Sequence, residues 1–282
     1  MIYNRYLIAC KKMDVMKHKK TKTSPGLSRR TVEYIRTITK EALTQAVHNN
    51  LILKNPVDGT TLPPKIKKEV VPYSKEESEQ FLNSITGHRL FAAYYLAFYT
   101  GLRKGEIIGL MWPDIDLNAG NFEVQRELVC IKNMDTGKQY LDFQLPKTPK
   151  SQRIIPLTDE LVKVLKSHKA KQNEERLFIG KEYHDENLVF CSEAGQRIWP
   201  RNFDRQYRSL LKQAGVDHKK FHTTRHTFAS LLIEAGEDIR NVQELLGHAV
   251  LSTTSDIYSH VMEKTKRKAV EKMSGLLNVK VD

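Results

Sequence analysis

Apolar residues recur at helical spacing through most of the chain, and this pattern predicts a mostly α-helical protein. Glycines stand at the expected ends of several helices, where glycine readily takes the left-handed conformation of a helix cap. The first 110 residues are predicted to hold four helices: residues 29–48 after the capping residue Ser28, a helix opened by the capping box of Ser74 and Glu77 that contains Phe81, Leu82 and Ile85, residues 89–100 before Gly101, and a short helix through Ile107, Ile108 and Leu110. Further helices are predicted near residues 158–175, 202–214, 223–235, 238–246 and 252–268, with Gly180, Gly215, Gly236 and Gly247 closing the first four.

The centre of the chain has a different pattern, rich in β-branched and aromatic residues between turn signals. Residues 122–131, 140–145 and 152–156 are predicted to form one small antiparallel sheet. The expected fold class is therefore mostly α with a small antiparallel β-sheet, an α+β arrangement.

A proline- and lysine-rich stretch, LPPKIKKEVVP at residues 62–72, separates two parts of the chain. Such composition is typical of a domain boundary. We therefore predict a small helical domain over residues 1–64, a basic linker over 65–72, and a larger domain over 73–282.

The net charge of +13 is concentrated at the front of the chain. Residues 1–69 hold 15 Lys and Arg against 5 Asp and Glu, whereas the other 213 residues hold 31 against 28. A basic segment on a nearly balanced body indicates a polyanion-binding module, and a solvated basic tail is the alternative. The linker residues Lys65, Lys67 and Lys68 are candidates for contacts to a DNA backbone.

The composition and motifs of the chain exclude several classes of protein. The longest apolar run, residues 90–99, is too short to cross a bilayer, and the N-terminus lacks a signal-peptide pattern. Three scattered cysteines argue against a disulfide framework or zinc cluster and suit a reducing cytoplasm. Phosphate-loop, HExxH and GxSxG motifs are absent, so we expect no cofactor, no metal and no membrane association.

The candidate chemistry consists of basic residues and one tyrosine. Read singly, each has an ordinary explanation as a surface ion pair, a turn lysine, a helix cap or a packed aromatic. Together they form an ordered set: Arg103 and Glu106 in TGLRKGE, Lys147 in LPKTPKS with Lys150 as its rival, His222 and Arg225 in HTTRH, His248 in LGH, and Tyr258 in DIYSH.

This ordered set resembles the tyrosine recombinases, the phage-integrase family. The family pattern is an arginine in a TGLRxGE context, a lysine in a β-turn, HxxR, LGH and a following tyrosine, and all five occur here in that order. The resemblance covers about residues 70–265 closely and the helix and linker at 28–72 more loosely. Five ordered motifs in one chain are a specific signal, whereas a lone HxxR would carry little weight.

The resemblance implies a site-specific recombinase that integrates or excises mobile DNA through a 3′-phosphotyrosyl intermediate, without metal or ATP. Its catalytic residues would be the phosphate ligands Arg103, Arg225 and His248, the nucleophile Tyr258, the base His222 and the acid Lys147, with Glu106 in support. Residues 73–282 would form the catalytic domain, ending in a tail that docks on a neighbouring protomer. The implied partners are double-stranded DNA, three further copies in a tetramer, and an accessory excisionase or bending protein, in a nucleoid-associated cytoplasmic setting.

Two other functions share these features. A topoisomerase of the same chemistry would relax DNA as a monomer without sequence preference, and a non-catalytic descendant would bind DNA without cutting it. We also expect the chain to begin inside the DNA-binding domain, because few residues precede the helix at 29–48. That expectation predicts an intact catalytic domain with weakened binding to its site.

Overall fold

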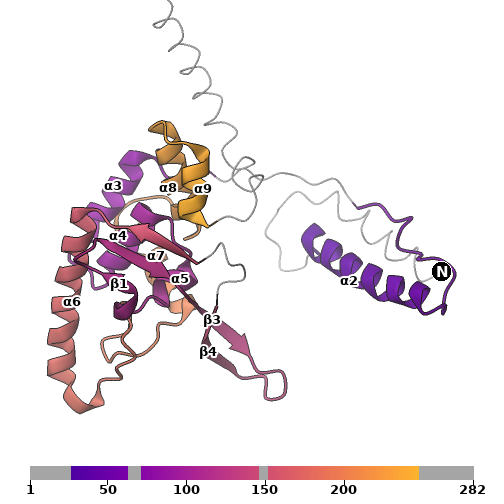
Figure 1. Cartoon of the computed structure of the whole chain (residues 1–282), viewed down its shortest axis with the longest axis horizontal. Coiled ribbons are helices and arrows are strands. Elements are labelled where there is room, and N and C mark those ends of the chain that lie inside the picture. The colour runs from indigo at the N-terminus through magenta and orange to yellow at the C-terminus, as the bar shows by residue number, and fades with distance from the viewer. Residues whose placement is uncertain (1–26, 63–70, 146–151, 248–282) are drawn as a thin grey trace, which may run out of the picture. The chain divides into compact units, whose positions relative to one another are not determined.

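The computed structural model describes residues 27–62, 71–145 and 152–247 (Figure 1). The chain separates into two compact units, Met1–Lys68 and Glu69–Asp282. The functions predicted for the two parts remain predictions.

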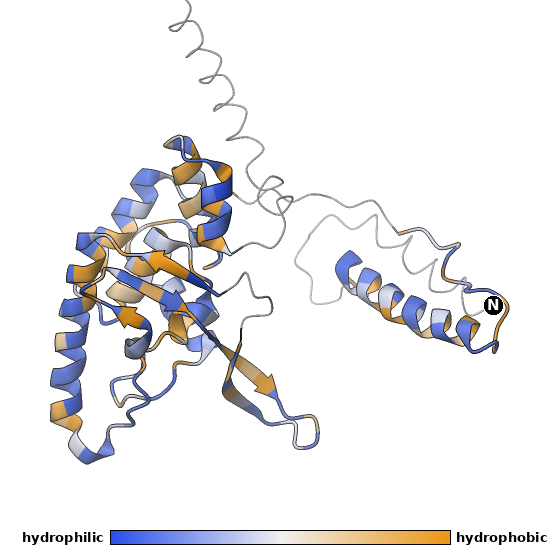
Figure 2. Cartoon of the chain, in the orientation of Figure 1, coloured by the Kyte–Doolittle hydropathy of each residue, from blue (hydrophilic) through white to orange (hydrophobic). Residues whose placement is uncertain are grey.

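The first unit contains helix α2, Arg29–His48, which begins and ends where the sequence predicts. Ser28 caps the helix by accepting a hydrogen bond from the backbone N–H of Thr31 at 3.2 Å. The loop that follows folds back on the helix, because the Asn55 amide donates to the Lys40 carbonyl at 2.9 Å. No residue of α2 is buried, and Figure 2 shows hydrophilic residues along most of its length.

The second unit is built around an aromatic core. Phe81, Tyr94 and Tyr207 contact one another with ring centroids 5.4–5.9 Å apart, and they come from three different helices. A smaller apolar cluster joins the last two described helices. The helices are α3 (Lys75–Ser84), α4 (Phe91–Thr100), α5 (Lys104–Ile108), α6 (Asp159–Ile179), α7 (Pro200–Gln213), α8 (Thr223–Glu234) and α9 (Ile239–Leu246), with short 3₁₀ turns at Trp112–Asp114 and Gly180–Glu182.

The strands form two sheets, so the prediction of a single sheet was wrong. A three-stranded antiparallel sheet has the order β1-β2-β5, and β3 and β4 pair separately as an antiparallel hairpin that extends away from the helices (Figure 1). The predicted strand at 122–131 divides at Gln125 and Arg126, and β1 was not foreseen. The strands are β1 (Ile115–Asp116), β2 (Asn121–Val124), β3 (Glu127–Lys132), β4 (Gln139–Gln144) and β5 (Arg153–Pro156).

The predicted fold class, mostly α with a small amount of antiparallel β-structure, is confirmed. Ser74 and Glu77 form the expected capping box, and α4, α7, α8 and α9 lie within a few residues of their predicted bounds, whereas α3 ends at Ser84 and does not include Ile85. Helix α6 continues to Ile179 beyond its predicted end, and α5 stops at Ile108 before Leu110. The helix predicted at 252–268 lies outside the described residues.

Gly101 ends α4 in the left-handed conformation, with φ at 62°. A Cβ added there would lie 2.6 Å from a ring carbon of Phe228 and 2.7 Å from a methyl carbon of Leu246. We expect Gly101→Ala to lower the free energy of unfolding by about 2–5 kcal/mol, because backbone strain and overpacking add. Urea denaturation followed by circular dichroism measures this loss.

Gly87→Ala is the matched control, since a Cβ at Gly87 meets nothing within 4 Å and its φ is not positive. Its effect should stay within about 0.5 kcal/mol, as for most surface substitutions. Equal stability of the two variants would contradict the tight approach of α8 and α9 to Gly101.

Candidate active site

Arg103 occupies the turn between α4 and α5, immediately before the first residue of α5. Its guanidinium donates from Nη1 to Oε1 of Glu106 at 2.8 Å, and its backbone N–H donates to Oε2 of the same carboxylate at 2.8 Å. The Arg103 side chain is 34% exposed, whereas Glu106 is 3% exposed. One buried carboxylate therefore holds both the backbone and the side chain of a solvent-facing arginine.

Glu106 also binds a second arginine, Arg153, at the start of β5. The two terminal nitrogens of Arg153 reach the two carboxylate oxygens at 3.2 and 3.1 Å. Burial disfavours the charged carboxylate, but the Arg153 guanidinium and then Arg103 outweigh it and lower the pKa of Glu106. Glu106 is therefore an ionised anchor between two guanidinium groups.

Sequence reasoning missed Arg153, although a signal was present. In β5 the side chains of Arg153 and Ile155 are buried while Ile154 is exposed. An arginine on the inward face of an alternating strand needs a buried partner. Its partner lies 47 residues away in sequence, so the pattern of β5 alone does not identify Glu106.

Arg225 lies in the first turn of α8 and is 1% exposed. Its Nη1 donates to the carbonyl of Gly101 at 2.9 Å, and its Nη2 donates to the carbonyl of Leu246 at 2.5 Å. Gly101 precedes Arg103 by two residues, so Arg225 is tied to the turn that carries Arg103.

His222 immediately precedes α8, one helical turn before Arg225, and much of it is exposed. Partial burial of its ring, followed by the positive charges of Arg225 and Arg103, lowers the pKa of His222. The Glu106 carboxylate acts in the opposite direction, so all three charged groups lie within electrostatic reach of this imidazole. His222 is accordingly neutral at physiological pH.

A second histidine, His226, packs against His222. The rings of His222 and His226 meet edge to face with centroids 4.8 Å apart. Burial, then His222 and Arg225, lower the pKa of His226 to about 4, so it stays uncharged beside His222.

The structure thus brings together Arg103, Glu106, His222 and Arg225 from two segments more than a hundred residues apart in sequence. The other predicted site residues lie outside the described residues, and their roles remain predictions. These are Lys65, Lys67, Lys68, Lys147 with its rival Lys150, His248 and Tyr258.

Helix α7 carries a basic stripe. Four exposed cations recur along it at helical spacing, while Phe203 and Tyr207 on the opposite side are buried. Asp204 of the same helix accepts a hydrogen bond from Lys104 of α5 at 2.6 Å, which joins α7 to the helix that follows Arg103. We define the α7 stripe as Arg201, Arg205, Arg208 and Lys212.

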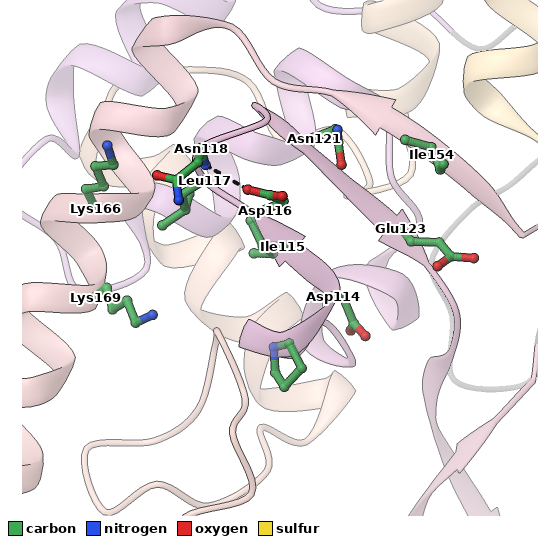
Figure 3. A pocket seen from close by; sticks show the side chains of 11 residues that line it. Asp114, Ile115, Asp116, Leu117, Asn118, Asn121, Glu123, Ile154, Lys166 and Lys169 are labelled. Atoms are coloured by element: carbon green, nitrogen blue, oxygen red, sulfur yellow. Dashed lines mark hydrogen bonds between the residues drawn. The ribbon is translucent and has the colours of Figure 1, made fainter.

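A separate open pocket lies between α6 and the three-stranded sheet, and none of the predicted site residues lines it (Figure 3). Its carboxylates have structural partners. Asp116 accepts hydrogen bonds from the backbone N–H groups of Asn118 and Ala119 at 2.9 and 2.8 Å, and Asp114 binds Arg126. These acidic residues therefore build a turn and an ion pair.

No group of three or more His, Cys, Asp or Glu side chains in the described part of the chain has the arrangement of a metal site. Across the same residues, every helix is too short or too polar to span a membrane.

Comparison with known proteins gives consistent matches. Residues 73–265 match the model of the phage integrase family. A tyrosine recombinase XerC-like protein of Caldanaerobacter subterraneus subsp. tengcongensis is 35% identical over 287 residues, which cover 98% of this chain and 73% of that protein. The ICEBs1 integrase of Bacillus subtilis strain 168 is 30% identical, over 89% of this chain and 67% of that protein.

Solved structures match as well. The Tn1549 transposon integrase in complex with circular intermediate DNA superposes with a TM-score of 0.72 at 22% identity, over 96% of this chain and 86% of that chain. The XerA recombinase superposes with a TM-score of 0.55 at 27% identity, over 76% of this chain and 67% of that chain. The first match shows a shared fold.

Proposed function

The chain belongs to the phage integrase family, and we propose that it is a site-specific recombinase acting through a 3′-phosphotyrosyl intermediate. Its relatives are tyrosine recombinases and integrases, which are DNA strand-transferring enzymes. One structural observation carries the proposal furthest. The buried Glu106 carboxylate fixes a solvent-facing Arg103 beside a neutral His222, which suits the binding of a phosphate next to a base.

The proposed chemistry is an in-line exchange of phosphodiesters. The Tyr258 oxygen forms a bond to phosphorus, its proton passes to His222, and the bond to the 5′-oxygen breaks as Lys147 protonates that oxygen. Negative charge develops on the non-bridging oxygens, where guanidinium groups and a histidine N–H stabilise it. Arg103, Arg225 and His248 fill this role in the proposal.

The second step reverses the first with a new 5′-hydroxyl, so the bond energy is retained and no ATP is consumed. A phenol suits both steps, because with a pKa of about 10 it is a better leaving group than an aliphatic alcohol. Arg225 is 1% exposed, and its direct contact with phosphate is part of the proposal.

Double-stranded DNA is the proposed partner, and several solved neighbours are recombinases in complex with DNA. A tetramer on two sites and an accessory excisionase or bending protein are part of the same proposal, as is a place on DNA in the cytoplasm. The basic linker residues Lys65, Lys67 and Lys68 and the α7 stripe would contact the DNA backbone.

Covalent capture from a pool of random duplexes tests the proposed function whatever the target sequence is. Nicked duplexes with randomised sequence are incubated with the protein, and SDS-resistant adducts are purified and sequenced. Capture of a few related sequences is the expected result. Bound duplexes without any adduct would support the non-catalytic descendant, and adducts without sequence preference would support a topoisomerase.

The pH profile of cleavage tests His222 as the base. Its pKa lies below its ordinary value, so the neutral form persists as the pH falls, and the acidic limb of the rate should lie below about pH 6.5. Single-turnover rates on a captured duplex from pH 4.5 to 8 measure this limb. His222→Gln should remove it and His218→Gln, at an exposed histidine, should not. A limb centred above pH 6.5 would contradict the assignment.

The α7 stripe should govern salt-dependent affinity. We expect Arg201→Gln, Arg205→Gln and Arg208→Gln together to weaken DNA binding and to reduce the slope of log K against log salt by up to about 3, roughly one per lost phosphate contact. Fluorescence anisotropy at several salt concentrations measures the slope. The control replaces three exposed lysines of α6 by glutamine, Lys163, Lys166 and Lys171, and so removes the same charge. An equal change of slope in this control would contradict a role for α7.

A further inference from the structure

The carboxyl end of α9 is held by two buried arginines from other elements. The last carbonyls of a helix lack partners within the helix. Here the Leu245 carbonyl accepts from Nε of Arg153 at 2.6 Å, and the Leu246 carbonyl accepts from Nη2 of Arg225 at 2.5 Å. Gly247 then ends the helix in the left-handed conformation.

Both arginines connect this helix end to the turn that carries Arg103. Arg153 binds Glu106 through both terminal nitrogens, and Arg225 binds the carbonyl of Gly101. Gly101 and Glu106 lie on either side of Arg103 in sequence. The position of Arg103 and that of the end of α9 are therefore set by the same two guanidinium groups.

Arg153 uses its planar fork fully. Its Nε reaches a backbone carbonyl while Nη1 and Nη2 form a paired contact with one carboxylate, and its side chain is 6% exposed. A lysine carries its three N–H donors on one nitrogen and lacks the rigid plane of separate nitrogens that reaches the carboxylate and the Leu245 carbonyl together. The arrangement thus demands arginine and not only a positive charge.

We propose that Arg153 is a positioning residue for strand transfer, acting through Glu106 on Arg103 and through Leu245 on the end of α9. Leu245 precedes His248, the predicted phosphate ligand, by three residues in sequence. This inference rests on the proposed function. Arg153 itself need not touch DNA.

The first test separates rate from the amount of active protein. Arg153→Lys is compared with wild type in single-turnover cleavage of a captured duplex, with the burst amplitude giving the active fraction. We expect a rate constant lower by about tenfold or more, because misplacement near the reacting groups costs rate, with DNA affinity within about threefold. A lower amplitude at an unchanged rate constant would mean a purely structural role and would overturn the proposal.

Arg89 offers a matched control elsewhere in the same unit. Its guanidinium also grips a carboxylate in a paired contact, with both nitrogen–oxygen distances to Glu175 at 2.7 Å, and donates to the carbonyl of Ser192 at 2.9 Å. Arg89→Lys should lower the melting temperature and the amplitude but leave the rate constant unchanged. If Arg89→Lys slows cleavage as much as Arg153→Lys, the proposal fails.

A double-mutant cycle tests whether Arg153 acts through Glu106. Residues in one hydrogen-bonded network give non-additive effects. The loss of rate in the double variant Arg153→Gln, Glu106→Gln should therefore be smaller than the product of the two single losses, with the contact to Leu245 accounting for what Arg153→Gln still costs. Independent, multiplying losses would overturn the route through Glu106.

Amide hydrogen exchange tests, without DNA, whether Arg153 holds the end of α9. Arg153→Lys should speed amide exchange in the last turn of α9, whereas Arg89→Lys should not. Unchanged exchange would contradict the claim that Arg153 holds the end of α9. If the wild-type protein captured no DNA at all, the proposed function would fail, and this measurement would still decide whether Arg153 holds α9.

Discussion

Tyr258→Phe is expected to abolish the covalent protein–DNA adduct while DNA affinity stays within about twofold, because only one oxygen is lost. In the proposed chemistry that oxygen is the atom that bonds to phosphorus, so no residual adduct should form. The measurement is SDS gel electrophoresis of the protein with a captured, labelled duplex, alongside anisotropy for binding. The affinity measurement shows that the variant is folded and reaches DNA.

Tyr140→Phe is the matched control, since Tyr140 is an exposed tyrosine on β4 that loses the same oxygen. It should form the adduct at the wild-type rate. An adduct that persists in Tyr258→Phe would falsify the assignment of the nucleophile, and peptide mapping of that adduct would then identify the residue that replaces it.

Arg103→Ala is expected to slow single-turnover cleavage by about 100- to 1,000-fold, comparable to removing one preorganised donor from a developing oxyanion. The structure explains why the effect should be large. Arg103 is held at 2.8 Å by a carboxylate that is itself fixed by Arg153, so its orientation is set before DNA binds. Arg103→Lys should recover part of the rate, because the charge returns without the planar fork.

Arg126 supplies the control for loss of a paired arginine. Each arginine is partly exposed and forms an ion pair with a buried carboxylate. The exposed fractions of the side chains are 22% for Arg126 and 4% for Asp114, compared with 34% for Arg103 and 3% for Glu106. Arg126→Ala should therefore cost similar stability and leave the cleavage rate near wild type. Similar rate losses in the two variants would mean that Arg103 acts only on folding.

The helices were predictable because the residues that begin and end them act on neighbours only a few positions away in the sequence. Ser28 and Ser74 hydrogen-bond to N–H groups three residues away, and Gly101 and Gly247 take the left-handed conformation that ends a helix. The sheets were less predictable. Pairing of β2 with β5 joins Phe122 to Ile155, and no local signal tells a continuous strand at 122–131 from two strands that belong to different sheets.

The residues of the site could be predicted from the sequence, but the hydrogen bonds that hold them together could not. Arg103, His222 and Arg225 stand in motifs, so their types and order could be read from the sequence. The contacts that organise them span long separations: Arg225 reaches Gly101 over 124 positions, and Arg153 reaches Leu245 over 92. Such contacts depend on the packed fold, and for that reason Arg153 looked like any other arginine near a turn.

The β3–β4 hairpin also offers a site for attaching a fluorescent label. Arg197 holds β4, donating to the Leu141 carbonyl at 2.9 Å and lying over the Phe143 ring at 4.4 Å. Cys130, the cross-strand partner of Leu141, is exposed, whereas Cys191 is buried. A thiol-reactive dye should therefore label Cys130 in preference to Cys191, and a fluorophore on this arm would respond to whatever molecule approaches the hairpin while the aromatic core stays untouched.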